Sequence, residues 1–361
     1  MPSNQNIKSS KVLILALSGI GDALMFTPAL QLLKTNLPST KFDALVMYKG
    51  VEQIYNRLPQ INNVLHFDFL NSNFISAIKF LFSIRKKYDI TINVYPSNRR
   101  EYNIISFFIG AKIRTAVDYL RQSKRNFSFL NTNLITEIDT LHNVEENLKL
   151  SEIATQKKTD NIPELLFPLN EEDLSFSTNF LNENKISEDQ IVVGFHPGCS
   201  TLKNHIKRRW EPEKFAELAS KLSAEFNAAI LLFGGEEERE LRRLIIEKSN
   251  AEKIIEVSAG NIAQSAAVMK RCNVFVSNDS GLMHIAASQK LKIVSIIGPT
   301  NTNYIHPWKT ENKIASLNLE CSPCFFYSPK PLSCKRTDVQ FKCIKELSVE
   351  SVFKKVKEYL T

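Results

Sequence analysis

The sequence has no apolar run long enough to cross a lipid bilayer. Its longest apolar stretch, residues 74–84, is interrupted by Lys79, whereas a membrane-spanning helix needs about 20 residues. Lys8 and Lys11 precede the short apolar run 12–17, as they would in a signal peptide, but no convincing small-residue cleavage site follows it. We therefore expect residues 12–17 to form a buried first strand and the protein to be cytoplasmic.

An acidic triad with metal-ligand spacing is also missing, which favours chemistry that requires no metal or other cofactor. Cysteine is scarce, and four of the six cysteines gather near the C-terminal end: Cys321, Cys324, Cys334 and Cys343. Their spacing allows a tetrahedral zinc site. A structural tail is the alternative that we favour. A cytosolic location argues against stable disulfides, and Cys199 and Cys272 fit small buried positions.

The chain has 361 residues, of which 43% are hydrophobic and 23% charged, the composition of a soluble globular protein. Single hydrophobic cores stop growing at roughly 250–300 residues, so the length predicts two domains.

The net charge of +8 is unevenly distributed. Residues 1–150 contain 18 Lys and Arg against 11 Asp and Glu, a net +7, and the remainder contributes 28 against 27, a net +1. Such an asymmetry suits an anionic partner such as a phosphorylated acceptor, a membrane surface or nucleic acid; a solvated basic face is the equally weighted alternative.

Apolar runs alternate with amphipathic segments, the pattern of an α/β protein. Strands are expected at residues 12–17, 42–47, 64–67, 90–94, 113–116, 191–195, 228–233, 254–257, 274–276 and 293–297. Helices are expected at residues 23–36, 74–86, 102–109, 143–154, 212–225, 236–248, 262–271, 281–288 and 349–360.

The polar stretch 156–190 separates the two halves and is expected to connect them. We predict an N-terminal acceptor-binding domain at 1–160 and a C-terminal donor-binding domain at 190–345. A final helix within 346–361 is expected to pack back on the N-terminal domain. Two Rossmann-like domains imply a cleft between them, where α/β proteins place ligands.

The first candidate site is the turn after the opening strand, Ser18-Gly19-Ile20-Gly21-Asp22. Gly19 and Gly21 let the backbone turn tightly and leave room for an acceptor substrate. Asp22 can satisfy backbone N–H groups at the start of a helix, or it can accept a proton as a general base.

The second candidate site is Asn278-Asp279-Ser280-Gly281-Leu282-Met283-His284. Ser280 can cap the following helix, Gly281 exposes a backbone N–H that suits an anion, and Asp279 can bind sugar hydroxyls. His284 lies one turn into the helix, where it either reaches a diphosphate or packs as an ordinary buried histidine. A base at one turn and an anion site at another indicate group transfer from a phosphorylated donor.

Three further segments carry polar residues after expected strands. Ser200 and Thr201, which precede the basic run Lys207-Arg208-Arg209-Trp210, can add hydroxyls to a phosphate. Gly234-Gly235-Glu236 can admit a nucleotide, with Glu236 on a ribose, or form a simple turn. In the N-terminal half Arg121, Lys124 and Arg125 alternate with Tyr119, Phe127 and Phe129; this cluster can meet lipid and phosphate, or its aromatic rings can pack inward.

Taken in chain order, these segments resemble glycosyltransferase family 9, the ADP-heptose:lipopolysaccharide heptosyltransferases. The shared features are the Asp22 turn, Gly194-Phe195-His196-Pro197-Gly198 with the basic run, Phe233-Gly234-Gly235-Glu236, the Asn278–His284 block and the segment from Leu141 to Leu148. The resemblance implies a GT-B fold, an inverting mechanism and a nucleotide-diphosphate sugar donor, with ADP-heptose transferred to a lipopolysaccharide core or related glycan.

The resemblance also implies residue roles. Asp22 matches the catalytic base, and Asp279, Ser280, Gly281, Leu282 and His284 match the residues that hold the donor diphosphate and sugar. Either Lys207 or Arg208 matches the family's phosphate-binding lysine. We expect an anionic glycolipid acceptor, peripheral contact with the inner membrane and no nucleic acid. A nucleotide-sugar epimerase and a non-catalytic sugar-nucleotide or glycolipid binding protein are the alternatives.

Overall fold

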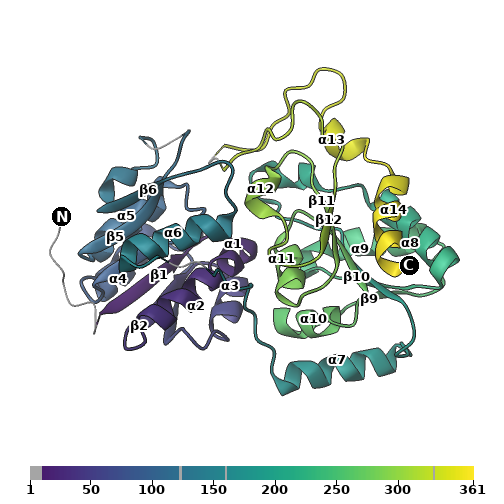
Figure 1. Cartoon of the computed structure of the whole chain (residues 1–361), viewed down its shortest axis with the longest axis horizontal. Helices are drawn as coiled ribbons and strands as arrows, with labels where there is room; N and C mark the ends of the chain where they lie inside the picture. Colours follow the sequence, from purple (N-terminus) through teal and green to yellow (C-terminus); the bar gives the residue numbers. More distant parts are fainter. Residues whose placement is uncertain (1–9, 122–123, 159–160, 328–329) are drawn as a thin grey trace. The chain divides into compact units, whose positions relative to one another are not determined.

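A computed structural model of the chain describes residues 10–121, 124–158, 161–327 and 330–361 (Figure 1). The chain forms two compact units, Met1–Pro168 and Leu169–Thr361. The stretch expected as a long connection contains α7 (Glu171–Glu183), which packs against α10 (Ile262–Met269) of the second unit. There the Ser177 hydroxyl donates to the Ala267 carbonyl at 3.1 Å. The connection is therefore shorter than the sequence suggested, because residues 169–190 belong to the second unit.

The first unit is built on a parallel sheet with the strand order β3-β2-β1-β4-β5-β6. Its strands are β1 (Lys11–Ala16), β2 (Lys41–Val46), β3 (Asn63–His66), β4 (Ile90–Asn93), β5 (Ile113–Asp118) and β6 (Asn133–Thr136). The central strands β1 and β4 are buried on both faces, as expected for a parallel sheet covered by helices on both sides. Five strands match the sequence predictions. The sixth, β6, was missed because an edge strand with only two apolar residues gives a weak signal.

The helices of the first unit are α1 (Ile20–Met25), α2 (Thr27–Asn36), α3 (Lys49–Tyr55), α4 (Phe74–Ile84), α5 (Arg100–Ile109), the 3₁₀ turn η2 (Ser128–Leu130) and α6 (Asn143–Thr155). The single helix expected at 23–36 is divided into α1 and α2. Pro28 lacks an N–H and favours the first turn of a helix, so a new helix starts at Thr27. The helix α3 was not predicted.

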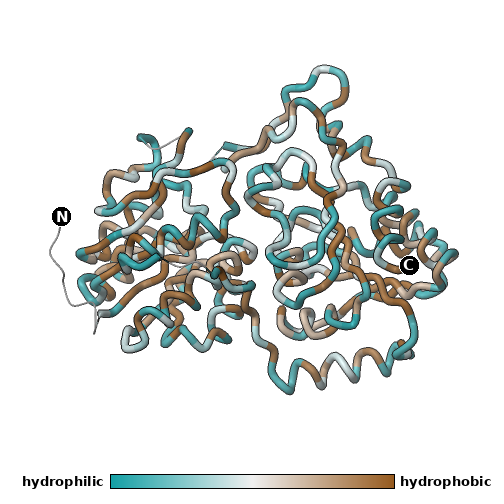
Figure 2. The backbone as a smooth tube through the Cα atoms, viewed as in Figure 1, coloured by the Kyte–Doolittle hydropathy of each residue, from teal (hydrophilic) through white to brown (hydrophobic). Residues whose placement is uncertain are grey.

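The second unit repeats the same design. Its strands are β7 (Val192–His196), β8 (Ala229–Leu232), β9 (Ile254–Glu256), β10 (Val274–Asn278), β11 (Ile293–Ile296) and β12 (Asn312–Ala315), all parallel, in the order β12-β11-β10-β7-β8-β9. Counted from its own first strand, this is the order of the first sheet. The edge strand β12 was missed, again because polar residues interrupt it. Figure 2 shows that the hydrophobic segments of the backbone, drawn in brown, lie in the interior of each unit.

The helices of the second unit are α7, η3 (Leu202–Arg208), α8 (Pro212–Phe226), η4 (Glu236–Glu238), α9 (Arg239–Lys248), α10, α11 (Gly281–Ser288), α12 (Thr302–Ile305), α13 (Lys342–Lys345) and α14 (Val349–Leu360). The helix expected at 236–248 begins with the separate turn η4. The helix α11 has the predicted bounds.

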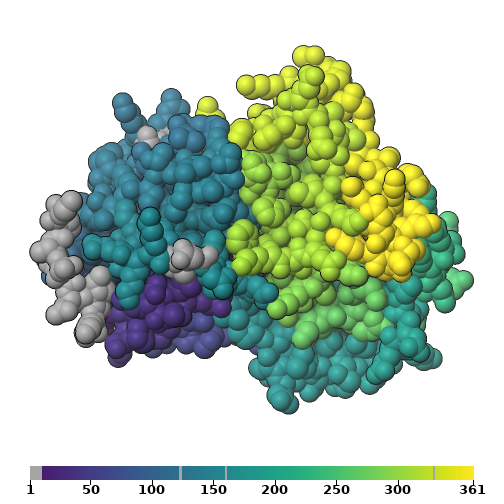
Figure 3. All heavy atoms as spheres, viewed as in Figure 1, coloured from purple at the N-terminus to yellow at the C-terminus, as the bar shows by residue number. Residues whose placement is uncertain are grey.

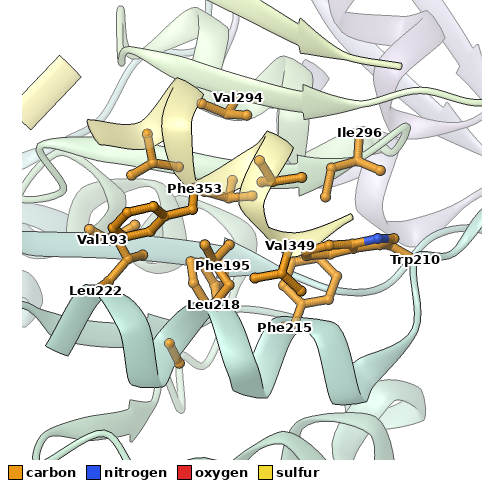
Figure 4. Packing of buried hydrophobic residues seen from close by; sticks show 14 of the residues in the cluster. Val193, Phe195, Trp210, Phe215, Leu218, Leu222, Val294, Ile296, Val349 and Phe353 are labelled. Carbon is orange, nitrogen blue, oxygen red and sulfur yellow. The ribbon is translucent and has the colours of Figure 1, made fainter. Parts of the chain in front are cut away.

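The helix α14 completes the core of the second unit. Its apolar face, with Val349 and Phe353, packs with Trp210 and Phe215 and with strands of the second sheet (Figure 4). In the space-filling view its yellow atoms lie against the teal atoms of α8 (Figure 3). Its buried side chains fit between α8 and β10–β12 of the second unit.

The strand order creates one switch point in each sheet, where consecutive connections leave in opposite directions. It lies between β1 and β4 in the first unit and between β7 and β10 in the second. Open α/β sheets bind ligands at the carboxyl ends of the strands at such points. Among the helices of the described ranges, none is both long enough and apolar enough to cross a membrane.

The packing of α14 predicts the effect of removing one ring. Phe353 is 5% exposed within the second core. Phe353→Ala should lower the free energy of unfolding by about 3–5 kcal/mol through lost burial and a residual cavity. Both tryptophans, Trp210 and Trp308, lie in the second unit, so their fluorescence during urea denaturation reports this change. Phe129→Ala, at a position 68% exposed, is the control; equal losses in both variants would contradict the assigned packing.

Candidate functional site

The switch point of the second sheet gathers the polar side chains of that unit. β10 ends at Asn278 and leads through Asp279 and Ser280 into α11, whose first turn is capped by the Ser280 hydroxyl accepting from the Met283 N–H at 3.4 Å. The Asn278 amide donates to the Pro197 carbonyl at 2.6 Å, and its oxygen accepts from the Trp210 N–H at 3.1 Å. One buried amide therefore fixes the ends of β7, β10 and η3 together.

A buried ion pair joins Arg208 to Asp279. The guanidinium Nη1 lies 2.5 Å from the Asp279 carboxylate, which also accepts from the Thr300 hydroxyl at 2.7 Å. Arg208 and Asp279 are 9% and 7% exposed. Thr300 follows β11, so the three residues come from three separate segments. An ion pair removed from water stabilises a protein only when such additional hydrogen bonds satisfy its partners.

The orientation of Arg208 is fixed by two rings. Its Nη2 lies 3.1 Å from His205 Nδ1, and the guanidinium carbon is 5.6 Å from the centre of the Phe325 ring. Burial, together with the positive charge of Arg208, lowers the pKa of His205 to about 4. His205 is thus neutral near pH 7 and can accept a hydrogen bond from Arg208.

A second buried network lies beside this ion pair and is centred on His196. Its Nδ1 is 2.8 Å from the Ser280 hydroxyl and its Nε2 is 3.1 Å from the Glu238 carboxylate. Burial raises the pKa of Glu238, but His196 and Arg209 outweigh this effect and hold the pKa below its usual value. A Cβ on Gly198 would lie 1.7 Å from the Glu238 carboxylate, so a side chain there would displace the carboxylate from His196.

His284 lies on α11 next to these groups and is 3% exposed. Burial lowers its pKa to about 4, so the ring is neutral near pH 7. Within the described part of the chain, its Nδ1 has no hydrogen-bond partner. A buried polar atom in this condition costs free energy and is suited to a ligand that supplies the missing bond.

The structure separates the predicted donor residues into two groups. Arg208, Asp279, Ser280 and His284 are buried around one end of the sheet, with Gly281 and Leu282 in the first turn of α11. The others are exposed: Ser200, Thr201, Lys207 and Glu236. Glu236 forms an ion pair with Arg239 at 2.7 Å. The buried carboxylate of this turn belongs instead to Glu238, two residues later.

The cysteine-rich segment supports the site through packing. Within the described ranges, no group of three or more His, Cys, Asp or Glu side chains is arranged to hold a metal ion. Cys321 and Cys324 are exposed, Cys334 is partly buried and Cys343 is buried. The N–H groups of Cys324 and Phe325 donate to the Pro299 carbonyl at 3.0 and 2.9 Å. These bonds hold the Phe325 ring near Arg208.

The switch point of the first sheet contains Asp22. This residue is in the first turn of α1, and its carboxylate accepts from the Gly19 N–H at 3.3 Å, the helix-capping contact that the sequence allowed. The Ser18 hydroxyl donates to the Pro96 carbonyl at 2.6 Å and joins the ends of β1 and β4. Asp22 is partly exposed.

Three residues near Asp22 were not predicted from the sequence. Burial raises the pKa of Tyr48, Arg99 lowers it, and the carboxylates of Asp68 and Asp22 raise it, with a net increase. Burial raises the pKa of Tyr102, Arg99 lowers it and Asp22 raises it, and the Tyr102 hydroxyl donates to the Leu17 carbonyl at 2.9 Å. Tyr48, Arg99 and Tyr102 thus surround the Asp22 turn. Their only sequence signal is a position just after an expected strand or at a helix start.

The predicted acceptor cluster is divided in its exposure. Arg121 forms a paired contact with Asp139, at 3.0 and 2.6 Å, and Lys124 and Arg125 are exposed; residues 122–123 lie outside the described ranges. Of the aromatic residues, Tyr119 points inward and is 2% exposed, whereas Phe129 is 68% exposed. The sequence allowed the aromatic rings either to face lipid or to pack inward. Both arrangements occur in this segment: Tyr119 packs inward and Phe129 is exposed.

Two sheets of identical Rossmann order, each with polar side chains at its switch point, define a GT-B glycosyltransferase architecture. The sequence pattern of glycosyltransferase family 9 (heptosyltransferase) matches residues 78–332. The chain belongs to this family and is a glycosyltransferase.

Relatives of known family resemble this chain over nearly its full length. The chain is 26% identical over 359 residues to lipooligosaccharide heptosyltransferase 2 of Campylobacter jejuni, covering 97% of this chain and 99% of the relative. Its fold matches a family 9 glycosyltransferase of Veillonella parvula (TM-score 0.76, 21% identity, 99% and 98% coverage). It also matches an E. coli heptosyltransferase solved with ADP-2-deoxy-2-fluoro heptose (TM-score 0.65, 19% identity, 96% and 99% coverage).

The His196 network predicts a pH-dependent contribution to stability. Because the pKa of Glu238 is lower in the folded protein, its contribution is present above the unfolded value of 4.5 and is lost as the pH falls through the folded value. Glu238→Gln should reduce the free energy of unfolding at pH 7 by about 1–3 kcal/mol. The difference in the free energy of unfolding between Glu238→Gln and wild type should become smaller in acid.

Urea denaturation at a series of pH values, followed by tryptophan fluorescence, measures this difference. The control is Glu236→Gln, at an exposed position, which should change stability by less than about 0.5 kcal/mol. A Glu238→Gln difference that is constant with pH would contradict the role of the carboxylate charge.

Proposed function

We propose that this protein transfers heptose from ADP-heptose to a lipopolysaccharide-core or lipooligosaccharide acceptor, with inversion at the anomeric carbon. Family membership and the full-length similarity to lipooligosaccharide heptosyltransferase 2 support the reaction. The E. coli heptosyltransferase of similar fold was solved with an ADP-heptose analogue, which supports the choice of donor. The observation that carries the proposal is the partly exposed Asp22 carboxylate at one switch point, together with the buried Arg208–Asp279 site at the other.

In this reaction Asp22 is the general base. As the acceptor hydroxyl oxygen forms a bond to the anomeric carbon, its proton passes to the Asp22 carboxylate. The bond between that carbon and the β-phosphate oxygen of ADP breaks on the opposite face, and ADP leaves with the bonding electrons. The Gly19 N–H contact at 3.3 Å orients the carboxylate at the start of α1.

The second unit stabilises the departing diphosphate in this proposal. Arg208 supplies a fixed positive charge, and the N–H groups of Gly281 and Leu282 open a helix whose positive end favours an anion. Asp279 and His284 provide hydrogen-bonding atoms for the sugar and the phosphate. Because protein groups supply the positive charge, the proposed reaction requires no cofactor, and chelation with EDTA should leave the rate unchanged.

The acceptor is an anionic glycolipid, and the excess of +7 in residues 1–150 favours its phosphates. Lys124, Arg125 and Arg121 are candidates for this contact. The protein then acts in the cytoplasm, peripherally at the inner membrane, and nucleic acid is not its partner. Turnover of donor without acceptor would indicate an epimerase, and donor binding without turnover would indicate a binding protein.

Removing the base tests the proposed mechanism. Asp22→Asn should lower kcat about 10²–10⁴-fold because the amide cannot accept the acceptor proton, and leave the Kd for ADP nearly unchanged. ADP release during transfer measures the rate, and calorimetry measures binding. Asp43→Asn, on the same sheet, is the control for a general loss of charge. Turnover near the wild-type rate in Asp22→Asn would refute the role of Asp22.

The two neighbouring cations are distinguished by their burial. Arg208→Ala should weaken ADP binding about 10- to 100-fold through the loss of a charge-assisted hydrogen bond, whereas Lys207→Ala, at an exposed position, should change the Kd less than about twofold. Thermal denaturation shows whether each variant is folded at the assay temperature. Similar Kd values for both folded variants would mean that the diphosphate is held by other residues.

A further inference from the structure

The helix α4 of the first unit is apolar on two sides. On the inner side Leu81 and Ile84 belong to the core. On the outer side Phe74, Ile75 and Phe82 are 78%, 66% and 54% exposed. Ile75 and Phe82 are two turns apart and share a side of the helix, and Phe74 lies beside them in the first turn, so the three side chains form one broad outward surface. We call this surface the α4 face; the helix lies at the edge of the first unit in Figure 1.

An exposed apolar surface of this kind indicates a binding site. A surface helix normally turns its apolar side inward and its polar side to water, and a helix that is apolar all round is normally covered. Single exposed apolar residues are common, but contiguous ones mark interaction sites. Here two aromatic rings and an isoleucine occupy the outward side.

The charged residues on α4 and in the four positions after it all have one sign. Residues 69–88 contain no Asp or Glu, and four cations follow or interrupt the α4 face: Lys79, Arg85, Lys86 and Lys87. All four are exposed, and the described residues provide none of them with an ion-pair partner. The Arg85 guanidinium lies 5.5 Å from the centre of the Phe82 ring, so cation and aromatic ring share one surface.

We propose that the α4 face binds the anionic phospholipid surface of a membrane, with Phe74, Ile75 and Phe82 among the headgroups and the four cations on lipid phosphates. Aromatic and basic side chains on one exposed helix are the combination that binds anionic interfaces. The inference deepens the proposed function, because it assigns the membrane contact of a glycolipid-modifying enzyme to one helix.

The position of α4 fits this role. The loop before the helix leaves the carboxyl end of β3, and Asp22 follows the carboxyl end of β1 in the same parallel sheet. Asp68 of that loop and Asp22 both act on the pKa of Tyr48, so the two segments are neighbours. The first turn of α4, with Phe74 and Ile75, therefore lies toward the edge of the sheet that carries Asp22. Arg85, Lys86 and Lys87 lie toward the opposite edge, where the Lys86 N–H donates to the Ile109 carbonyl. Docking through α4 thus lays the side of the unit on the lipid surface and leaves the Asp22 edge beside it.

Vesicle sedimentation with the full chain tests the proposal. We expect wild type to bind vesicles of phosphatidylglycerol and phosphatidylcholine, and not vesicles of phosphatidylcholine alone. Phe74→Ser with Phe82→Ser should weaken binding at least about tenfold, because two rings no longer leave water. The matched control is Phe107→Ser with Leu134→Ser, which removes two apolar side chains exposed by 49% and 37% elsewhere on the same unit.

The cations are tested separately. Lys79→Gln with Lys87→Gln should weaken binding to the anionic vesicles roughly 25-fold, about fivefold for each cation. Lys354→Gln with Lys355→Gln on α14 removes the same charge from the second unit and should have little effect.

Three outcomes would overturn the proposal: no binding of wild type to anionic vesicles, equal losses in the α4 and control variants, or a dimer that Phe74→Ser with Phe82→Ser dissociates without changing vesicle binding. The last would show that a second copy covers the α4 face. Transfer to a lipid-free oligosaccharide acceptor should be equal in wild type and the α4 variants. If wild type fails in that assay but binds vesicles, the proposed reaction is wrong and the membrane contact stands.

Discussion

The buried ion pair between Arg208 and Asp279 is the interaction on which the second unit's site depends. Taking two charges out of water carries a large desolvation cost, which is offset only where geometry and additional hydrogen bonds are favourable. Thr300, His205 and the Phe325 ring supply those contacts from separate segments. The ion pair therefore requires η3, the end of β10, the end of β11 and the cysteine-rich segment to be in place together. This dependence explains why the cysteine-rich segment, which carries Phe325, belongs to the site.

The same arrangement leaves the site poised for an anion. Arg208 is oriented before any ligand binds, and the neutral rings of His205 and His284 add no competing charge. A preorganised cation does not have to be reoriented when charge develops on a leaving group, which is the main source of electrostatic stabilisation in enzymes. Asp279 partly neutralises the guanidinium, so in the proposed reaction the diphosphate would share Arg208 with this carboxylate.

The sequence was sufficient to predict the architecture and the turns that carry the candidate site. It was not sufficient to predict which side chains contact one another within that site. Long apolar runs alternating with amphipathic helices predicted ten of the strands, whereas β6 and β12 were missed because edge strands bury little apolar surface. Asp22, Asp279 and Ser280 were recognisable because each follows a strand. The structure buries Arg208 rather than Lys207, and Glu238 rather than Glu236. Which side chain is buried depends on the local backbone conformation of each turn. Neighbouring residues of the same charge give no indication of that conformation in the sequence.

The packing of α14 has a consequence for how the chain is made. Proteins are synthesised from the N-terminal end, and domains generally fold as units while synthesis proceeds. The first unit has all its strands by residue 136, whereas the second sheet receives Val349, Val352, Phe353 and Val356 only when α14 has emerged from the ribosome. Until then an apolar face spanning β10–β12 is open to water. The nascent second unit is therefore a natural client for chaperones.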